Sequence, residues 1–173
     1  MRKISFIVAL LILIGLPSAA QAAGKRFLDI QEVKSGSGVT AWLVEAHDQH
    51  LIALDIAFLG AGASLDPTDK QGLVHMVAGT LDEGAGDMDS QAFQKTLADN
   101  SIALSFSADR DDFMGAVKTL TRHRDLAFNL LHLALTKPRF DQEAVDRIRA
   151  ANIARIKSSM SDPDWMAARL LND

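Results

Sequence analysis

Residues 101–108 read SIALSFSA, and their strict alternation of apolar and small side chains constrains the fold more than any other segment. Side chains of an extended strand point to opposite faces in turn, so this strand has one apolar face and one small, polar face. The apolar set is Ile102, Leu104, Phe106 and Ala108, and the small set is Ser101, Ala103, Ser105 and Ser107. A charged turn at 109–112 and an apolar run at 113–120 then predict a half-buried antiparallel hairpin.

Three further strands precede this hairpin in the sequence. Residues 28–46 read as two strands around the turn 35–38, where two glycines suit the positive φ of a hairpin. Residues 51–59 form a nearly continuous apolar run, which is typical of a strand that is buried on both faces or central in its sheet. Glycines at 60 and 62 and the pair Asp66-Pro67 then predict a bend and a turn.

Helical patterns fill the remaining segments. We expect helices at about 71–81, at 90–99 with Asp89 or Ser90 as cap, at 124–137, from Asp141 to Pro163, and after Pro163. The buried stripe of the helix after Asp141 is predicted to comprise Val145, Ile148, Asn152 and Ile156. This order predicts an α+β domain with an antiparallel or mixed sheet and helices packed on one face. The 71–81 helix should pack on a sheet formed from segments 28–59 and 102–120.

The first residues have the features of a secretory signal peptide. Arg2 and Lys3 precede an apolar run of about 13 residues, and small residues around Ala22 follow that run. The alternative is a membrane anchor, but a helix needs roughly 20 apolar residues to span a bilayer. We therefore expect residues 1–22 to be cleaved, which leaves an exported, periplasmic protein with no membrane span.

Composition excludes several function classes. The sequence has no cysteine, so no disulfide can stabilise the domain. Its net charge of −4 is made of interspersed cations and anions, which argues against a nucleic-acid-binding surface. The sequence also lacks a GxSxG motif and a phosphate-binding loop.

One residue of the predicted 71–81 helix has an unexpected chemistry. His75 stands among small apolar residues, and a histidine on a helix can belong to a zinc site. Such a helix offers a second ligand four residues later and a glutamate beside it as general base. Here Ala78 and Gly79 occupy those places, and neither can bind a metal or carry a proton.

This segment, DPTDKQGLVHMVAGTLDEGAG, resembles the motif helix of the insulinase/pitrilysin metallopeptidases, which include the mitochondrial processing peptidase. Active members carry His-x-x-Glu-His after Gly-Leu. Two flanking segments, SGVTAWLVEAHDQHLIALDIAFLGAGASLD and FDQEAVDRIRAANIARIKSSMSDPD, resemble the family as well. The resemblance covers residues 23–173 but only the first part of a typical member. We therefore expect an incomplete N-terminal insulinase-type peptidase domain.

The resemblance implies that the catalytic site is degenerate. His75 matches the first zinc ligand, Ala78 the general base and Gly79 the second ligand, while the third ligand falls on Ala154 or Arg155. We therefore expect no catalytic residue and no metal in this chain. His75 is then a packed or hydrogen-bonded remnant; the alternatives are a partial metal site with Asp82 or Glu83, or another catalytic role.

The other histidines are weaker candidates. His47 and His50 lie three residues apart and could imitate a ligand pair, but they stand at a strand junction, in what we expect to be a solvated turn. His123 follows a strand between Arg122 and Arg124, where two like charges disfavour a bound cation.

Two functions of different classes follow from the resemblance. Family members work as pairs of similar domains, and one of the pair can lack the zinc. The first hypothesis is a non-catalytic subunit that binds peptides together with an active, zinc-containing homologue. By position, the peptide would add as a strand along residues 102–107, namely Ile102, Ala103, Leu104, Ser105, Phe106 and Ser107. The second is an active zinc metalloendopeptidase whose ligands are rebuilt or supplied by a partner.

Overall fold

The computed structural model describes residues 28–172, in two units that divide between His47 and Asp48. The expected signal peptide, residues 1–22, lies outside the described residues. Within residues 28–172, no helix is both long enough and apolar enough to cross a membrane.

The first unit contains one antiparallel hairpin. Strand β1 (Ile30–Lys34) pairs with β2 (Thr40–Val44), and Ile30 lies opposite Val44. In the turn, the amide of Val39 donates a hydrogen bond of 3.0 Å to the Ser35 hydroxyl, and Gly38 has a φ of 90°. This confirms the two predicted strands. The expectation that they share a sheet with the 102–120 hairpin is wrong, because β1 and β2 form a two-stranded sheet of their own.

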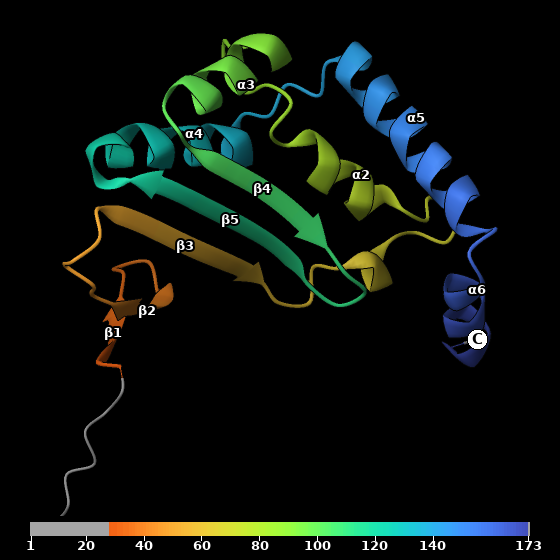
Figure 1. Ribbon diagram of the computed structural model, residues 1–173, viewed down its shortest axis with the longest axis horizontal. Coiled ribbons are helices and arrows are strands. Elements are labelled where there is room, and N and C mark those ends of the chain that lie inside the picture. Colours follow the sequence, from red (N-terminus) through yellow and green to blue (C-terminus); the bar gives the residue numbers. More distant parts are fainter. Residues whose placement is uncertain (1–27, 173) are drawn as a thin grey trace, which may run out of the picture. The chain divides into compact units, whose positions relative to one another are not determined.

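The second unit is an antiparallel sheet with helices on one face (Figure 1). Its strands are β3 (Leu51–Phe58), β4 (Ala103–Ala108) and β5 (Phe113–Leu120), in the order β3-β5-β4. Its α-helices are α2 (Leu73–Thr80), α3 (Ser90–Asp99), α4 (Arg124–Thr136), α5 (Gln142–Ser159) and α6 (Pro163–Asn172). Short 3-10 helices, η2 (Ala63–Leu65) and η3 (Thr121–His123), stand before α2 and α4.

Strand β3 lies at an edge of this sheet and not at its centre, so that prediction was wrong. Leu51, Ala53, Asp55 and Ala57 are exposed on one face, and the residues between them are half-buried on the other. The run looked continuous because two of the exposed positions are alanines, which need no burial. Strand β5 is the central strand, and its alternate side chains are buried.

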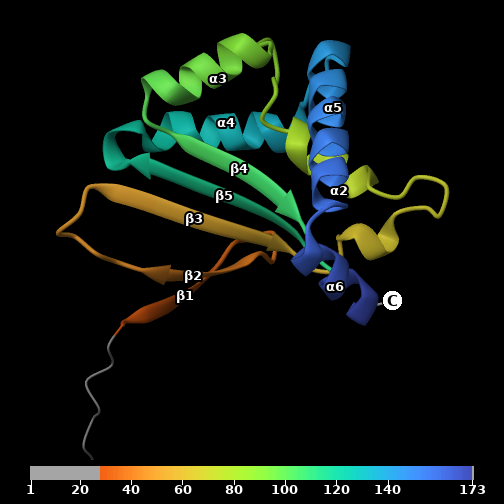
Figure 2. The same cartoon turned by 45° about the vertical axis from the view of Figure 1, so that its right-hand side comes forward.

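Helices α3 and α4 cover one face of the sheet, as Figure 2 shows from the side. Buried residues from these helices and from β4 and β5 form a single core, with Phe93 and Leu97 from α3 and Leu130 and Leu131 from α4. Ile102 and Leu104 are buried in this core, and Phe106 packs partly against it. This confirms that the apolar set of residues 101–108 faces the helices.

Helix α2 packs against β4 and α5 and starts two residues later than predicted. Gly72 has a φ of 91°, a left-handed conformation that cannot belong to the helix and that glycine adopts without strain. Asp66 compensates for the missing cap, since its carboxylate accepts hydrogen bonds from the amides of Gly72 and Val74 at 2.8 and 3.1 Å.

The predicted stripe of α5 is correct only in its first half. Ala144 is buried, and Val145, Ile148 and Asn152 are half-buried. Ile156, the last residue of the predicted stripe, is 52% exposed, so the prediction is wrong there.

Candidate functional site

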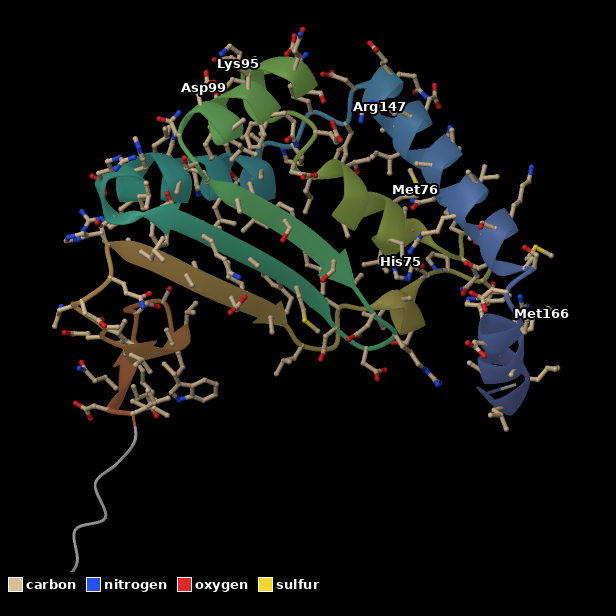
Figure 3. All side chains as sticks on the ribbon, in the orientation of Figure 1. His75, Met76, Lys95, Asp99, Arg147 and Met166 are labelled. Atoms are coloured by element: carbon tan, nitrogen blue, oxygen red, sulfur yellow. The ribbon has the colours of Figure 1, made fainter. Side chains whose placement is uncertain are left out.

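The structure places His75 on the solvent-exposed side of α2 (Figure 3). Its side chain makes no hydrogen bond to any other residue that the structure describes. Its one recorded interaction is electrostatic: the pKa of Asp109 is lowered by hydrogen bonds from the amides of Asp112 and Asp111 and, to a smaller extent, by His75. The expectation of a packed or hydrogen-bonded remnant was therefore wrong.

The general-base position is filled by a core residue. Ala78 is 5% exposed and packs in a small cluster with Leu81 and Phe113. A carboxylate at this position would enter an apolar contact, where a charge without a partner is strongly disfavoured. The position at which we expected the general base is therefore a packing position in the core.

The second ligand position is closed by α5. A Cβ atom built on Gly79 would lie 3.0 Å from the Cγ2 atom of Ile148. Few real Cβ atoms have so close a neighbour, so any side chain at 79 requires Ile148 to move. The absence of a side chain at Gly79 lets α2 and α5 approach each other closely.

The third ligand position is in solvent. Ala154 and Arg155 are both exposed, and Arg155 reaches only the Asn152 side-chain oxygen, at 3.5 Å. Asn152 in turn donates to the sulfur of Met76 at 3.5 Å. Residues Ile148 and Asn152 thus make the contacts with α2, and the two residues expected at the lost ligand position do not.

These positions do not fit a catalytic zinc. Such an ion needs three protein ligands with a fourth position open. Within residues 28–172, no group of three histidine, cysteine, aspartate or glutamate side chains is arranged to hold a metal. Among the positions expected to bind the ion, only His75 has a side chain of a zinc-ligand type.

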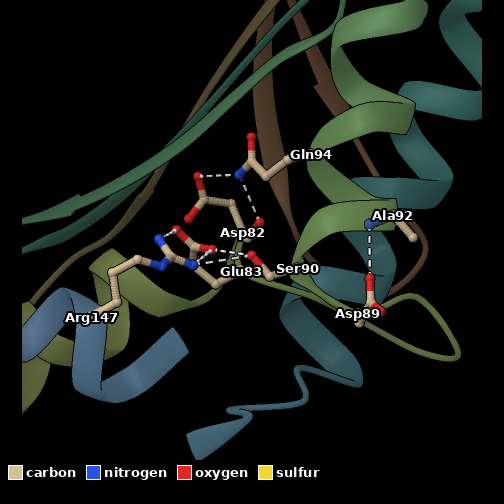
Figure 4. A network of polar contacts seen from close by, with 7 residues as sticks. All are labelled: Asp82, Glu83, Asp89, Ser90, Ala92, Gln94 and Arg147. Carbon is tan, nitrogen blue, oxygen red and sulfur yellow. Dashed lines mark hydrogen bonds and ion pairs between the residues drawn. The ribbon is translucent and has the colours of Figure 1, made fainter. Parts of the chain in front are cut away.

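Asp82 and Glu83 belong to a different polar network, which joins α2, α3 and α5 (Figure 4). Arg147 donates to both carboxylate oxygens of Glu83, at 3.1 and 2.7 Å, and also to the Ser90 hydroxyl at 3.2 Å. Ser90 donates a short hydrogen bond to Glu83. The side-chain amide of Gln94 donates to the Asp82 carbonyl at 2.9 Å. The Glu83 carboxylate is therefore held by Arg147 and Ser90, whereas the Asp82 carboxylate receives only a 3.5 Å contact from Gln94.

The two neighbouring carboxyls have opposite pKa shifts. The hydrogen bonds from Arg147 hold the pKa of Glu83 below its usual value. Burial raises the pKa of Asp82, an effect that hydrogen bonds from the backbone and from Gln94 offset in part. A hollow of about 620 Å³ borders this network and is lined mostly by acidic and amide side chains. Its lining includes Glu83, Asp89, Asp141 and Arg147.

Sequence reasoning missed this network. Glu83 and Arg147 lie 64 positions apart, and neither belongs to a periodic pattern. The one available signal was the short polar stretch after α2, which marked a loop but did not identify its partner.

Strand β4 has a free edge at the place predicted for peptide addition. It pairs with β5 alone, and among the described residues its other edge has no strand beside it. Ala103, Ser105 and Ser107 are exposed, whereas Leu104 is buried. Ile102 lies just before the strand and is also buried, so within 102–107 the exposed side chains come from alternate positions only.

The remaining histidines form no site. His47 lies 2.9 Å from Glu45 on an exposed loop, and the carbonyl of His50 accepts a hydrogen bond from Thr121. Arg122 donates to the Nε2 atom of His123 at 3.0 Å.

Comparison with known proteins identifies the family. The model of the insulinase family, peptidase family M16, matches residues 44–172. The chain belongs to the insulinase family. Its similarity to relatives within that family is moderate, and it spans about a third of their length.

A Helicobacter pylori protein called "Non-peptidase homolog YmxG" is 26% identical over 156 residues, which is 90% of this chain and 35% of that protein. Among solved structures, the inactive M16 peptidase domain from Pseudomonas fluorescens superposes with a TM-score of 0.74 at 22% identity, covering 83% of this chain and 35% of the other. A structure described as a protease from Helicobacter pylori superposes with a TM-score of 0.66 at 15% identity, covering 80% and 33%. These two likenesses show that this insulinase-family chain has the α+β fold of M16 domains.

Proposed function

We propose that this insulinase-family chain is a non-catalytic subunit that binds extended peptides along β4, in a complex with an active, zinc-containing homologue. The free edge of β4, in contact with helix α2, is the observation that carries the proposal. Zinc in the complex would be held by the partner, and this chain would contribute peptide binding.

Backbone hydrogen bonds do not depend on zinc, so a chain without a catalytic site can still bind peptides. An edge strand presents a row of unpaired amide and carbonyl groups, and an extended peptide can pair with them without any metal. Outside its pairing with β5, no residue of β4 makes a backbone hydrogen bond to another described residue. The exposed side chains of β4 are small, one alanine and two serines.

The relatives support a non-catalytic role. One of them is named a non-peptidase homolog and another an inactive peptidase domain. In this chain the positions of the base and of one ligand are occupied by Ala78 and Gly79, and α5 is packed against the latter. The alternative is an active zinc metalloendopeptidase with ligands rebuilt or supplied by a partner. It is favoured only by the solvent exposure of His75, which would allow that imidazole to meet an outside ligand.

The test of peptide binding uses backbone-methylated peptides. Along an extended peptide, the amides that face a neighbouring strand alternate with amides that face away. We expect methylation of one alternate set to abolish binding to the full-length protein and methylation of the other set to leave it almost unchanged. Fluorescence anisotropy measures both. Equal effects of the two sets would contradict strand addition.

The cellular location completes the proposal. The sequence pattern of residues 1–22, which is typical of a cleaved signal peptide, supports export, and we propose that the mature protein is periplasmic. N-terminal sequencing of the protein recovered from a periplasmic fraction tests this directly. We expect the mature chain to begin at Ala23.

A further inference from the structure

The face of the sheet opposite α3 and α4 is covered with small side chains. Across β4, β5 and β3 it presents alanine and serine at most positions. The residues on this open face include Ala103, Ser105, Ser107, Met114, Ala116, Lys118, Leu51, Ala53, Asp55 and Ala57. A shallow hollow of about 330 Å³ lies over the middle of the face and is lined by Ser105, Ser107, Met114 and Ala116, among others.

Two charged side chains stand on this open face, Lys118 on β5 and Asp55 on β3. Both are exposed, and neither forms an ion pair or a hydrogen bond with another residue that the structure describes. Their distances from the free edge differ. Lys118 lies directly opposite Ala103 of β4, whereas Asp55 lies opposite Ala116, one strand further from that edge.

We infer that the edge of β4 selects extended peptides carrying an acidic side chain at the position that faces Ala103. This inference rests on the proposed strand addition and names the chemistry that would determine which peptides bind best. The acidic group would meet the unpaired ammonium of Lys118 across the open face.

The geometry of a sheet allows this contact. Strands lie about 4.8 Å apart, so a residue of an added strand would be about 10 Å from Lys118 and about 14 Å from Asp55. Lys118 and a glutamate of the peptide, extended toward each other, can span the shorter distance. Asp55 and a lysine of the peptide do not easily span the longer distance. Ala103 lies between the peptide and Lys118, and its methyl group is too small to block the contact.

The side chains further along β4 provide no competing charge. Ser105 and Ser107 are neutral, and behind them on β5 stand Ala116 and Met114. A peptide side chain facing Ser107 would therefore rest beside an apolar surface. The resulting pattern is an acidic residue facing Ala103 and an uncharged residue at each of the next two positions on the same face.

Binding of guest peptides to the full-length protein tests the inference. The probes are uncharged host strands of about ten residues, the length of a long natural strand. Each is methylated on the amides that do not bind, which prevents the peptides from pairing with one another. Glutamate, glutamine or lysine is placed at each alternate position in turn. At the one position that faces Ala103, we expect the glutamate peptide to bind about two- to five-fold more tightly than the glutamine peptide, as for exposed ion pairs. The lysine peptide should bind more weakly than the glutamine peptide.

A charge reversal provides the decisive comparison. Lys118→Glu should reverse the order, so that the lysine peptide binds best. Lys95→Glu on α3 changes the net charge equally, but α3 covers the other face of the sheet, so the order should be unchanged. If peptides bind but Lys118→Glu leaves the order unchanged, the inference is overturned and strand addition stands. If no peptide binds any variant or the wild type, strand addition is overturned and this inference with it.

Discussion

At the scale of single residues, Gly79 determines how closely two helices approach. Glycine inside a helix costs about 1 kcal/mol relative to alanine, so its presence in α2 calls for a compensating contact. That contact is with Ile148, whose Cγ2 atom lies 3.0 Å from the place where a Cβ atom would be. Position 79, at which the resemblance implies a lost zinc ligand, is therefore also a position where α2 packs closely against α5.

This close approach predicts an energetic coupling between the two residues. Gly79→His should lower the free energy of unfolding by about 1–3 kcal/mol, the usual cost of overpacking. In an Ile148→Ala background the same substitution should cost clearly less, because the methyl group that it meets is gone. Urea unfolding of the four proteins in this cycle measures the coupling. Equal costs in both backgrounds would show that Ile148 does not limit the space at 79.

Asp82 and Glu83 provide a prediction on pH. The pKa of Glu83 is lowered in the folded protein, so its contribution to stability is present above the unfolded pKa and is lost as the pH falls through the folded pKa. The pKa of Asp82 is raised, so its contribution is present below the unfolded pKa and is lost as the pH rises through the folded pKa. The two residues therefore act with opposite signs on acidification.

Two isosteric substitutions separate these contributions. Around pH 4, near the ordinary carboxyl pKa values, the stability of Glu83→Gln should rise less steeply with pH than that of the wild type. The stability of Asp82→Asn should rise more steeply. The measurement is the urea midpoint at a series of pH values. Slopes that change in the same direction would refute the opposite pKa shifts.

At the scale of elements, the start of α2 depends on a residue outside the helix. Asp66 accepts from the amides of Gly72 and Val74, and these are donors that the helix itself leaves without partners. Asp66→Ala should therefore cost about 0.5–2 kcal/mol, as loss of a capping side chain does, and should speed hydrogen exchange in α2. Asp69→Ala, in the same loop but exposed, is the matched control and should change stability by less than about 0.5 kcal/mol.

Elements with a clear local period were predictable from the sequence. The alternation of residues 103–108 and the capped pattern beginning at Asp89 both correspond to observed elements, β4 and α3. Such patterns are written in neighbouring residues, so they need no knowledge of the rest of the chain. The position of β3 was not predictable in this way, because alanines at its exposed positions imitate the pattern of a buried strand.

Contacts between elements that are distant in the sequence could not be predicted from such local patterns. The residue types at positions 75, 78 and 79 indicated a lost metal site, but the facing of His75 depends on how α2 rotates against β4 and α5. The bond between Glu83 and Arg147 likewise depends on two helices meeting. Glu83 retains only 11% of its side-chain exposure, compared with 53% for Arg147, so the carboxylate is the member that requires the pair.

At the scale of the whole molecule, the proposed role leads to a prediction about metal and catalysis. The purified full-length protein should contain no stoichiometric zinc and should not cleave peptides, because the described positions supply one imidazole at most. In complex with an active homologue, one zinc per pair is expected. His75→Ala should leave turnover of that complex nearly unchanged, since the side chain makes no contact that strengthens in the transition state.

Metal analysis and a peptidase assay on the same samples check this prediction. The comparison requires the wild type and His75→Ala, each alone and in the complex. Chelator-sensitive cleavage by the protein alone, abolished by His75→Ala, would favour the active metalloendopeptidase instead.

The bare edge of β4 also has a consequence for how the protein behaves in concentrated solution. Natural sheets protect exposed edges with a lysine, a proline or a bulge, because unpaired strands seed aggregation. Residues 103–108 contain no proline and no charged side chain, and their pairing with β5 runs without interruption. Two copies can therefore join edge to edge through the same backbone groups that would hold a peptide. A ligand on this edge would act as a solubility factor, and its removal should turn a dispersed protein into one that self-associates as its concentration rises.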